Sequence, residues 1–94
     1  MHTKGCQDPG YRSLKPGGYN CKDDICINNN VGYSDLENAW IACGLIKGCA
    51  KIMEYYNGNY FLRASNDPYD DSDPTLKHVD YDCNGKIAVI STKQ

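Results

Sequence analysis

The apolar positions of residues 34–46 follow the period of an amphipathic helix. Ser34 and Glu37 have the spacing of a capping box, in which each side chain satisfies a free backbone N–H group at the helix start. Behind this box, apolar residues recur three and four positions apart, as on one buried helix face: Leu36, Ala39, Trp40 and Cys43. The pattern predicts a helix over about residues 35–46, with Trp40 in the core.

Two strand-like runs come next, separated by an Asn-Gly dipeptide. Residues 51–56 and 59–64 flank Asn57-Gly58, which is a strong signal for a β-hairpin with a two-residue loop. Such a loop places residue 56 opposite residue 59, and residue 52 opposite residue 63. Because side chains alternate along a strand, this register gives one apolar face, which we expect to pack on the helix: Met53, Tyr55, Tyr60 and Leu62.

In this register the other face of the hairpin mixes aromatic rings, an amide and a charge pair. It supplies the candidate binding residues: Glu54, Tyr56, Asn59, Phe61 and Arg63. Two interpretations are open. The face is either an exposed contact surface or a second buried layer beneath the N-terminal third of the chain, with Glu54 and Arg63 paired at its edge.

The length and the cysteine content favour a small domain held by disulfides. The chain has 94 residues, which we assign to a single domain over residues 1–94 with a thin core. Its cysteines are even in number: Cys6, Cys21, Cys26, Cys43, Cys49 and Cys83. Neither a Cys-x2-Cys pair nor paired Cys and His occurs, so this pattern indicates disulfides in an oxidising compartment rather than a metal site.

The N-terminal third, residues 1–32, is rich in Gly, Pro and Asn and predicts loops and short strands around its cysteines. Together these features predict the α+β class: a disulfide-stapled domain with the 35–46 helix packed on an antiparallel sheet that contains the 51–64 hairpin.

The segment from residue 65 to residue 82 is acidic and predicts a long loop, with one helical turn around residues 75–78. At its end, Asp80, Asp82 and Asn84 have the spacing of the first three ligands of a calcium loop. Calcium is therefore the one candidate cofactor. A non-standard site would be completed by one of three further carboxylates: Asp70, Asp71 or Asp73.

A hairpin turn at Asn84-Gly85 is the alternative interpretation of the same residues, and it is the one we favour. Ser91 stands where a calcium loop carries a bidentate Glu, and no long flanking helix is predicted. In this interpretation residues 86–92 form a last strand, because they are rich in β-branched side chains.

Residues 33–63 resemble the apple/PAN family of extracellular modules. The likeness lies in the order of the capping box, Ala39-Trp40, Cys43, Cys49 and two strands with an aromatic centre. It implies a disulfide from the helix end to the next strand, and one between the first and last cysteines. These would be Cys43–Cys49 and Cys6–Cys83, leaving Cys21–Cys26. The chain departs from the family at Ala39 and Leu62, where the family often has a further disulfide.

The resemblance implies a non-catalytic recognition module, secreted and binding an extracellular protein or a carbohydrate. An even cysteine count argues against a free thiolate nucleophile, and Glu37 and Glu54 are not placed to form a glycosidase cleft. The formal net charge is −2 and no apolar run is long enough to span a membrane. We therefore expect neither nucleic-acid binding nor membrane insertion.

Two other classes of function suit a small disulfide-rich chain. One is a freely secreted effector such as a toxin, a protease inhibitor or a signalling peptide, for which residues 66–74 would be the inhibitory loop. The other is an extracellular matrix or structural protein, which the Tyr, Gly and Asp content suggests.

Overall fold

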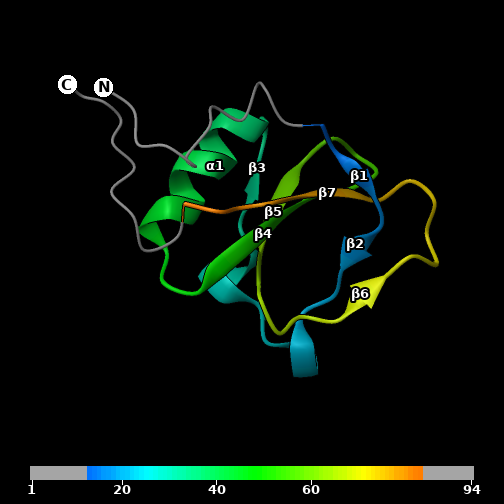
Figure 1. Cartoon of the computed structure of the whole chain (residues 1–94), viewed down its shortest axis with the longest axis horizontal. Helices are drawn as coiled ribbons and strands as arrows, with labels where there is room; N and C mark the ends of the chain where they lie inside the picture. The colour runs from blue at the N-terminus through cyan, green and yellow to red at the C-terminus, as the bar shows by residue number, and fades with distance from the viewer. Residues whose placement is uncertain (1–12, 84–94) are drawn as a thin grey trace.

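The computed structural model describes residues 13–83, in which one helix packs on antiparallel sheets (Figure 1). In that range the larger sheet has five strands in the order β1-β7-β4-β5-β3. Their bounds are Lys15–Pro16 for β1, Lys77–Asp80 for β7, Cys49–Glu54 for β4, Tyr60–Ala64 for β5 and Gly32–Tyr33 for β3. The remaining elements are α1 (Leu36–Leu45), β2 (Gly18–Tyr19) paired with β6 (Tyr69–Asp70), and the 3-10 turns η2 (Lys22–Asp24) and η3 (Ile27–Asn30). The predicted α+β class is confirmed.

Helix α1 is capped by Asp35 and not by Ser34, one residue later than the capping-box pattern predicts. The Asp35 carboxylate accepts a hydrogen bond from the Asn38 backbone N–H at 2.8 Å and another from the Asn38 side-chain amide at 3.0 Å. A charged acceptor also interacts favourably with the positive end of the helix dipole, which favours Asp35 over the neighbouring hydroxyl. The buried face is the predicted one, since Trp40 and Cys43 lie in the core.

The β4–β5 hairpin forms as predicted, but its register is shifted by one residue. Ile52 lies opposite Leu62, and Glu54 lies opposite Tyr60. Because a shift of one residue exchanges the faces of one strand relative to the other, the predicted pairing of side chains across the hairpin is wrong. Ile52 and Leu62 now share the face that packs on α1.

The loop of the hairpin explains the shift. The Tyr55 N–H donates to the Asn59 carbonyl at 2.8 Å, and the Gly58 N–H donates to the Tyr55 carbonyl at 2.9 Å, which leaves residues 56–58 as the loop. Gly58 has a φ of 89°, in the left-handed region. This is a type I turn followed by a left-handed glycine, the usual geometry of a three-residue hairpin loop. An Asn-Gly sequence suits this loop as well as the two-residue one.

The second face of the sheet is also covered, by the N-terminal part of the chain. Met53 is buried beneath β2, where the Tyr19 N–H lies 3.4 Å from its sulfur and a Cβ on Gly18 would lie only 2.7 Å from the same atom. His78 is buried on this face too, with its Nδ1 3.0 Å from the Gly17 carbonyl oxygen. A second buried layer therefore exists, but it is not the predicted face, because Met53 lies in it and Glu54 lies on the opposite side of the sheet.

A β-bulge at Ala50 aims Cys49 at the helix. The pairing of β4 with β5 shifts between Cys49 and Lys51, so Ala50 is an extra residue in the strand. Without it, Cys49 would share the face of Lys51 and point away from α1. With it, Cys43 and Cys49 are both fully buried and form a disulfide with a Cα–Cα distance of 5.3 Å.

Two disulfides lie within residues 13–83, and both join the predicted partners: Cys21 to Cys26 and Cys43 to Cys49. Cys83 is buried and also disulfide-bonded. Cys6, the partner that the apple/PAN resemblance implies for it, lies outside the described residues.

The segment after β5 is more ordered than the predicted loop. The helical turn expected around residues 75–78 is wrong, because residues 77–80 form β7 between β1 and β4. The turn expected at Asn84-Gly85 and the strand expected over residues 86–92 lie outside the described residues.

Truncating Leu62 should test the packing of the sheet on α1. Leu62 is 1% exposed against α1, so Leu62→Ala should lower the free energy of unfolding by about 2–5 kcal/mol. Ile41→Ala is the control, because Ile41 is 55% exposed and its loss should cost less than about 1 kcal/mol. Urea unfolding followed by circular dichroism measures both, and equal losses would contradict this packing.

Candidate binding surface

The five residues predicted to form one binding face lie in different environments. Glu54 is on the α1 side of the sheet, whereas Arg63 is on the opposite side and is only 6% exposed. Tyr56 and Asn59 belong to the hairpin turn, and Phe61 is partly buried. A single exposed face containing Glu54 and Arg63 is therefore wrong, because the register places these two residues on opposite faces.

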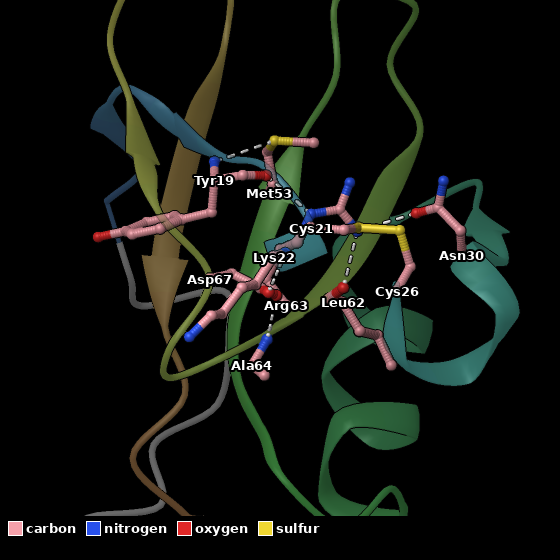
Figure 2. Close-up of a disulfide and its surroundings, with 10 residues drawn as sticks. All are labelled: Tyr19, Cys21, Lys22, Cys26, Asn30, Met53, Leu62, Arg63, Ala64 and Asp67. Carbon is pink, nitrogen blue, oxygen red and sulfur yellow. Dashed lines mark hydrogen bonds between the residues drawn. A yellow bond between two sulfur atoms is a disulfide. The ribbon is translucent and has the colours of Figure 1, made fainter. Parts of the chain in front are cut away.

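Arg63 is a buried tie between β5 and the N-terminal segment (Figure 2). Its Nε–H donates to the Tyr19 carbonyl at 2.8 Å, and a terminal N–H group donates to the Asn30 side-chain oxygen at 2.8 Å. The same nitrogen lies 2.9 Å from the Leu62 carbonyl oxygen. Burial lowers the pKa of Arg63 from its ordinary value, and the nearby Asp67 charge opposes that shift. The guanidinium is thus committed to structure.

Asp67 is a second buried charged group, and it holds the same region together (Figure 2). One carboxylate oxygen accepts a hydrogen bond from the Ala64 N–H at 2.7 Å, and the other accepts one from the Lys22 N–H at 2.9 Å. Hydrogen bonds to charged groups are stronger than neutral ones, and buried charges require such partners. Arg63 and Asp67 therefore fix the segment that begins at Cys21 onto the sheet.

Replacing Arg63 should destabilise the fold strongly. Arg63→Met keeps much of the volume but leaves the Tyr19 carbonyl and the Asn30 amide without their donor, so we expect a loss of about 2–5 kcal/mol. Lys51→Met is a matched control, because Lys51 lies directly opposite Arg63 and only places its ammonium 4.9 Å from the Tyr19 ring. Its loss should be under about 1 kcal/mol in urea unfolding. Similar losses for the two variants would count against this role of Arg63.

Three aromatic side chains gather at the end of the hairpin, and we call them the aromatic cluster: Tyr55, Tyr56 and Phe61. The Tyr55 ring centre lies 4.6 Å from that of Tyr56 and 5.9 Å from that of Phe61. Tyr56 is 67% exposed and Tyr55 is also exposed. Exposed aromatic area of this kind, grouped rather than scattered, is typical of a contact surface.

Gly32 in β3 makes room for the inner ring of the cluster. It lies opposite Phe61, and a Cβ at this position would lie 3.1 Å from the ring. The Phe61 ring also lies 5.7 Å from the central guanidinium carbon of Arg63. Phe61 is therefore packed between neighbouring strands, and its ring lies 5.9 Å from that of the exposed Tyr55.

Polar groups beside the aromatic cluster form hydrogen bonds within the protein. Glu54 accepts a hydrogen bond from the Tyr60 hydroxyl at 3.1 Å on the other face of the sheet. Burial raises the pKa of Tyr60, and the negative charge of Glu54 adds to that shift. The turn itself contributes amide groups, with the Asn57 side-chain oxygen accepting from the Asn59 N–H at 3.0 Å. Aromatic rings with neutral amides suit the binding of an uncharged, amphipathic surface.

The predicted calcium ligands are only partly described. Asp80 forms an ion pair with Lys15 at 2.8 Å, Asp82 is exposed, and Asn84 lies outside the described residues. Between residues 13 and 83 no group of three metal-ligating side chains is present. Asp70 and Asp73 accept hydrogen bonds within their own turns, which lowers the pKa of each carboxyl.

The Lys15–Asp80 pair should make stability depend on pH in the acid range. The hydrogen bond from Lys15 lowers the pKa of Asp80 below its unfolded value of about 3.9. The pair's contribution is therefore complete above that value and is lost as the pH falls through the folded pKa. Both side chains are half-exposed, so we expect only about 0.2–1 kcal/mol.

Urea unfolding of the parent and of Lys15→Met, from about pH 2 to pH 6, measures this contribution. The difference between the two proteins should shrink toward the acid end. A difference that does not change with pH would show that the pair makes no such contribution.

Sequence reasoning missed Tyr55 as a surface residue, because the wrong register assigned it to the core face. The exposure of Tyr55 could have been predicted from the two adjacent tyrosines directly before Asn57-Gly58, because side chains on both faces are exposed next to a turn. The candidate inhibitory loop over residues 66–74 is folded into turns and β6. Trp40 is in the core as predicted, with its ring 4.6 Å from that of Tyr81.

Comparisons with protein-family models, curated proteins and solved structures return no match. No helix in the described part of the chain is both long and apolar enough to cross a membrane. The apple/PAN resemblance of residues 33–63 therefore stays a prediction.

Proposed function

We propose that this chain is a secreted, non-catalytic recognition domain that binds a protein or carbohydrate partner through the aromatic cluster of Tyr55, Tyr56 and Phe61. The disulfides are typical of an oxidising, extracellular-type environment. The observation that carries the proposal is the exposure of adjacent aromatic rings at the end of a rigid hairpin.

Rigidity supports a binding role for the cluster. The hairpin is braced by β7 along β4 and by β3 along β5, and its loop has a defined hydrogen-bond pattern. A surface that is already ordered loses little conformational entropy when a partner binds. Tyrosine adds to this advantage, because it offers a large contact area with few rotatable bonds and a hydroxyl for hydrogen bonding.

Membership of the apple/PAN family is part of the same proposal. The helix on an antiparallel sheet and the Cys43–Cys49 bond agree with what that resemblance implies. The buried titratable side chains of the described range support a non-catalytic role, because Arg63 and Asp67 hold the backbone and the His78 Nδ1 lies 3.0 Å from the Gly17 carbonyl oxygen.

Removing the exposed rings should abolish binding without unfolding the domain. The double variant Tyr55→Ser and Tyr56→Ser should lose at least about tenfold in affinity, as expected of exposed hot-spot residues. Ile41→Ser, an exposed apolar residue on α1, should bind like the parent. Partners are sought on a glycan array and by capture from extracellular fluid, and affinities are then measured by calorimetry.

Equal binding by the double variant and the parent would show that the cluster is not the recognition surface. Thermal unfolding of all three proteins checks that the fold is intact. If the parent binds no glycan and captures no protein that survives purification and titration, the recognition function itself fails.

A further inference from the structure

The loop closed by the Cys21–Cys26 disulfide presents one apolar side chain to solvent. Ile25 is 76% exposed in this loop. The Asp24 N–H donates to the Cys21 carbonyl at 3.1 Å, and the Ile25 N–H donates to the Lys22 carbonyl at 3.0 Å. The disulfide and two turn hydrogen bonds thus fix the position of Ile25, which the fold leaves exposed.

The backbone of this loop passes through the left-handed region. Asp23 and Asp24 have φ of 55° and 61°, which Asp and Asn adopt more readily than other L-residues do. The disulfide and the turn hydrogen bonds hold the loop in this conformation.

Two buried charged side chains, Asp67 and Arg63, also hold this loop in place by hydrogen bonds (Figure 2). Asp67 accepts the Lys22 N–H, while Arg63 bonds Tyr19 just before the loop and Asn30 just after it. Anchors on both flanks, a disulfide and local hydrogen bonds together hold the exposed Ile25 in one position. Preorganisation of this kind increases affinity for a partner.

The chemistry of the loop selects among partner classes. An isoleucine side chain has neither a π-face for stacking on a sugar or a base nor a hydrogen-bonding group. The loop carries Lys22, Asp23 and Asp24, all exposed, so its formal charge is one cation minus two anions, or −1. That balance disfavours phosphates and anionic lipids and favours a rim of basic side chains around an apolar pocket.

We propose that the Cys21–Cys26 loop is a second recognition element, which inserts Ile25 into an apolar pocket with a basic rim on a protein partner. This inference rests on the proposed recognition function and narrows the partner at this site to a protein. The loop and the aromatic cluster are separate surfaces: η2 lies at the lower edge of Figure 1, and the hairpin turn lies at its upper right.

The test uses a phage-displayed library of random linear peptides selected on the parent protein. The selected peptides should combine apolar residues with Lys or Arg. They should lose at least about tenfold in affinity on Ile25→Ser and keep full affinity on Ile41→Ser, the exposed isoleucine of α1. Peptides that bind Ile25→Ser as tightly as the parent, or a failure to enrich any peptide, would overturn the proposal.

Two further variants separate the charge of the loop from its rigidity. The double variant Asp23→Asn and Asp24→Asn keeps residues that tolerate left-handed φ, and should weaken binding while reducing its dependence on salt. The double variant Cys21→Ser and Cys26→Ser keeps Ile25 but releases the clamp, and should also weaken binding. Unchanged affinity in both variants would overturn the mechanism.

These experiments distinguish a failure of the Ile25 loop proposal from a failure of the proposed recognition function. Peptides that lose affinity on Tyr56→Ser but not on Ile25→Ser would support the aromatic cluster and reject the loop. Circular dichroism and thermal unfolding confirm that each variant is folded before its affinity is compared.

Discussion

The left-handed Gly58 sets the register on which the rest of this structure depends. With Gly58 closing a three-residue loop, Ile52 and Leu62 face the helix, whereas Met53 and Arg63 face the opposite side. A two-residue loop would shift the pairing by one residue and exchange the faces of one strand relative to the other. The bulge at Ala50 follows from the same constraint. In this register Cys49 reaches the helix only if β4 gains one residue.

A sheet covered on both faces requires two different layers from a short chain. One face has a helix with a regular apolar stripe, and its core includes Trp40 and Leu62. The other face is covered by β2 and the loops around it, which offer few large apolar side chains and are held by hydrogen bonds instead. Arg63 in β5 and Asp67 in the turn after it make those bonds. The desolvation of two charges is offset by backbone groups that would otherwise lack partners.

The sequence predicts the elements of this fold better than their contacts. The helix and its buried face follow from the spacing of Leu36 to Cys43, and the hairpin follows from Asn57-Gly58, because these signals are local. The hairpin register cannot be predicted in this way, because an Asn-Gly pair is compatible with both a two-residue and a three-residue loop. Which loop forms depends on how the whole strands pair. Arg63 was placed on a contact face for the same reason. The N-terminal layer has no periodicity, and its position depends on hydrogen bonds to residues more than forty positions away, such as those from Arg63 to Tyr19 and from Lys22 to Asp67.

Covering both faces also determines where a partner can bind. The outer strands of the described sheet, β1 and β3, have only two residues each, which is too short to pair with an added strand. Contacts must then be made by side chains at the ends of the sheet and on its loops. Tyr56 stands at the hairpin end and Ile25 on the disulfide loop, and both are more exposed than a core residue of their type would be. The interactions that bury the sheet thereby leave its periphery as the part of the described sheet where the proposed recognition surfaces lie.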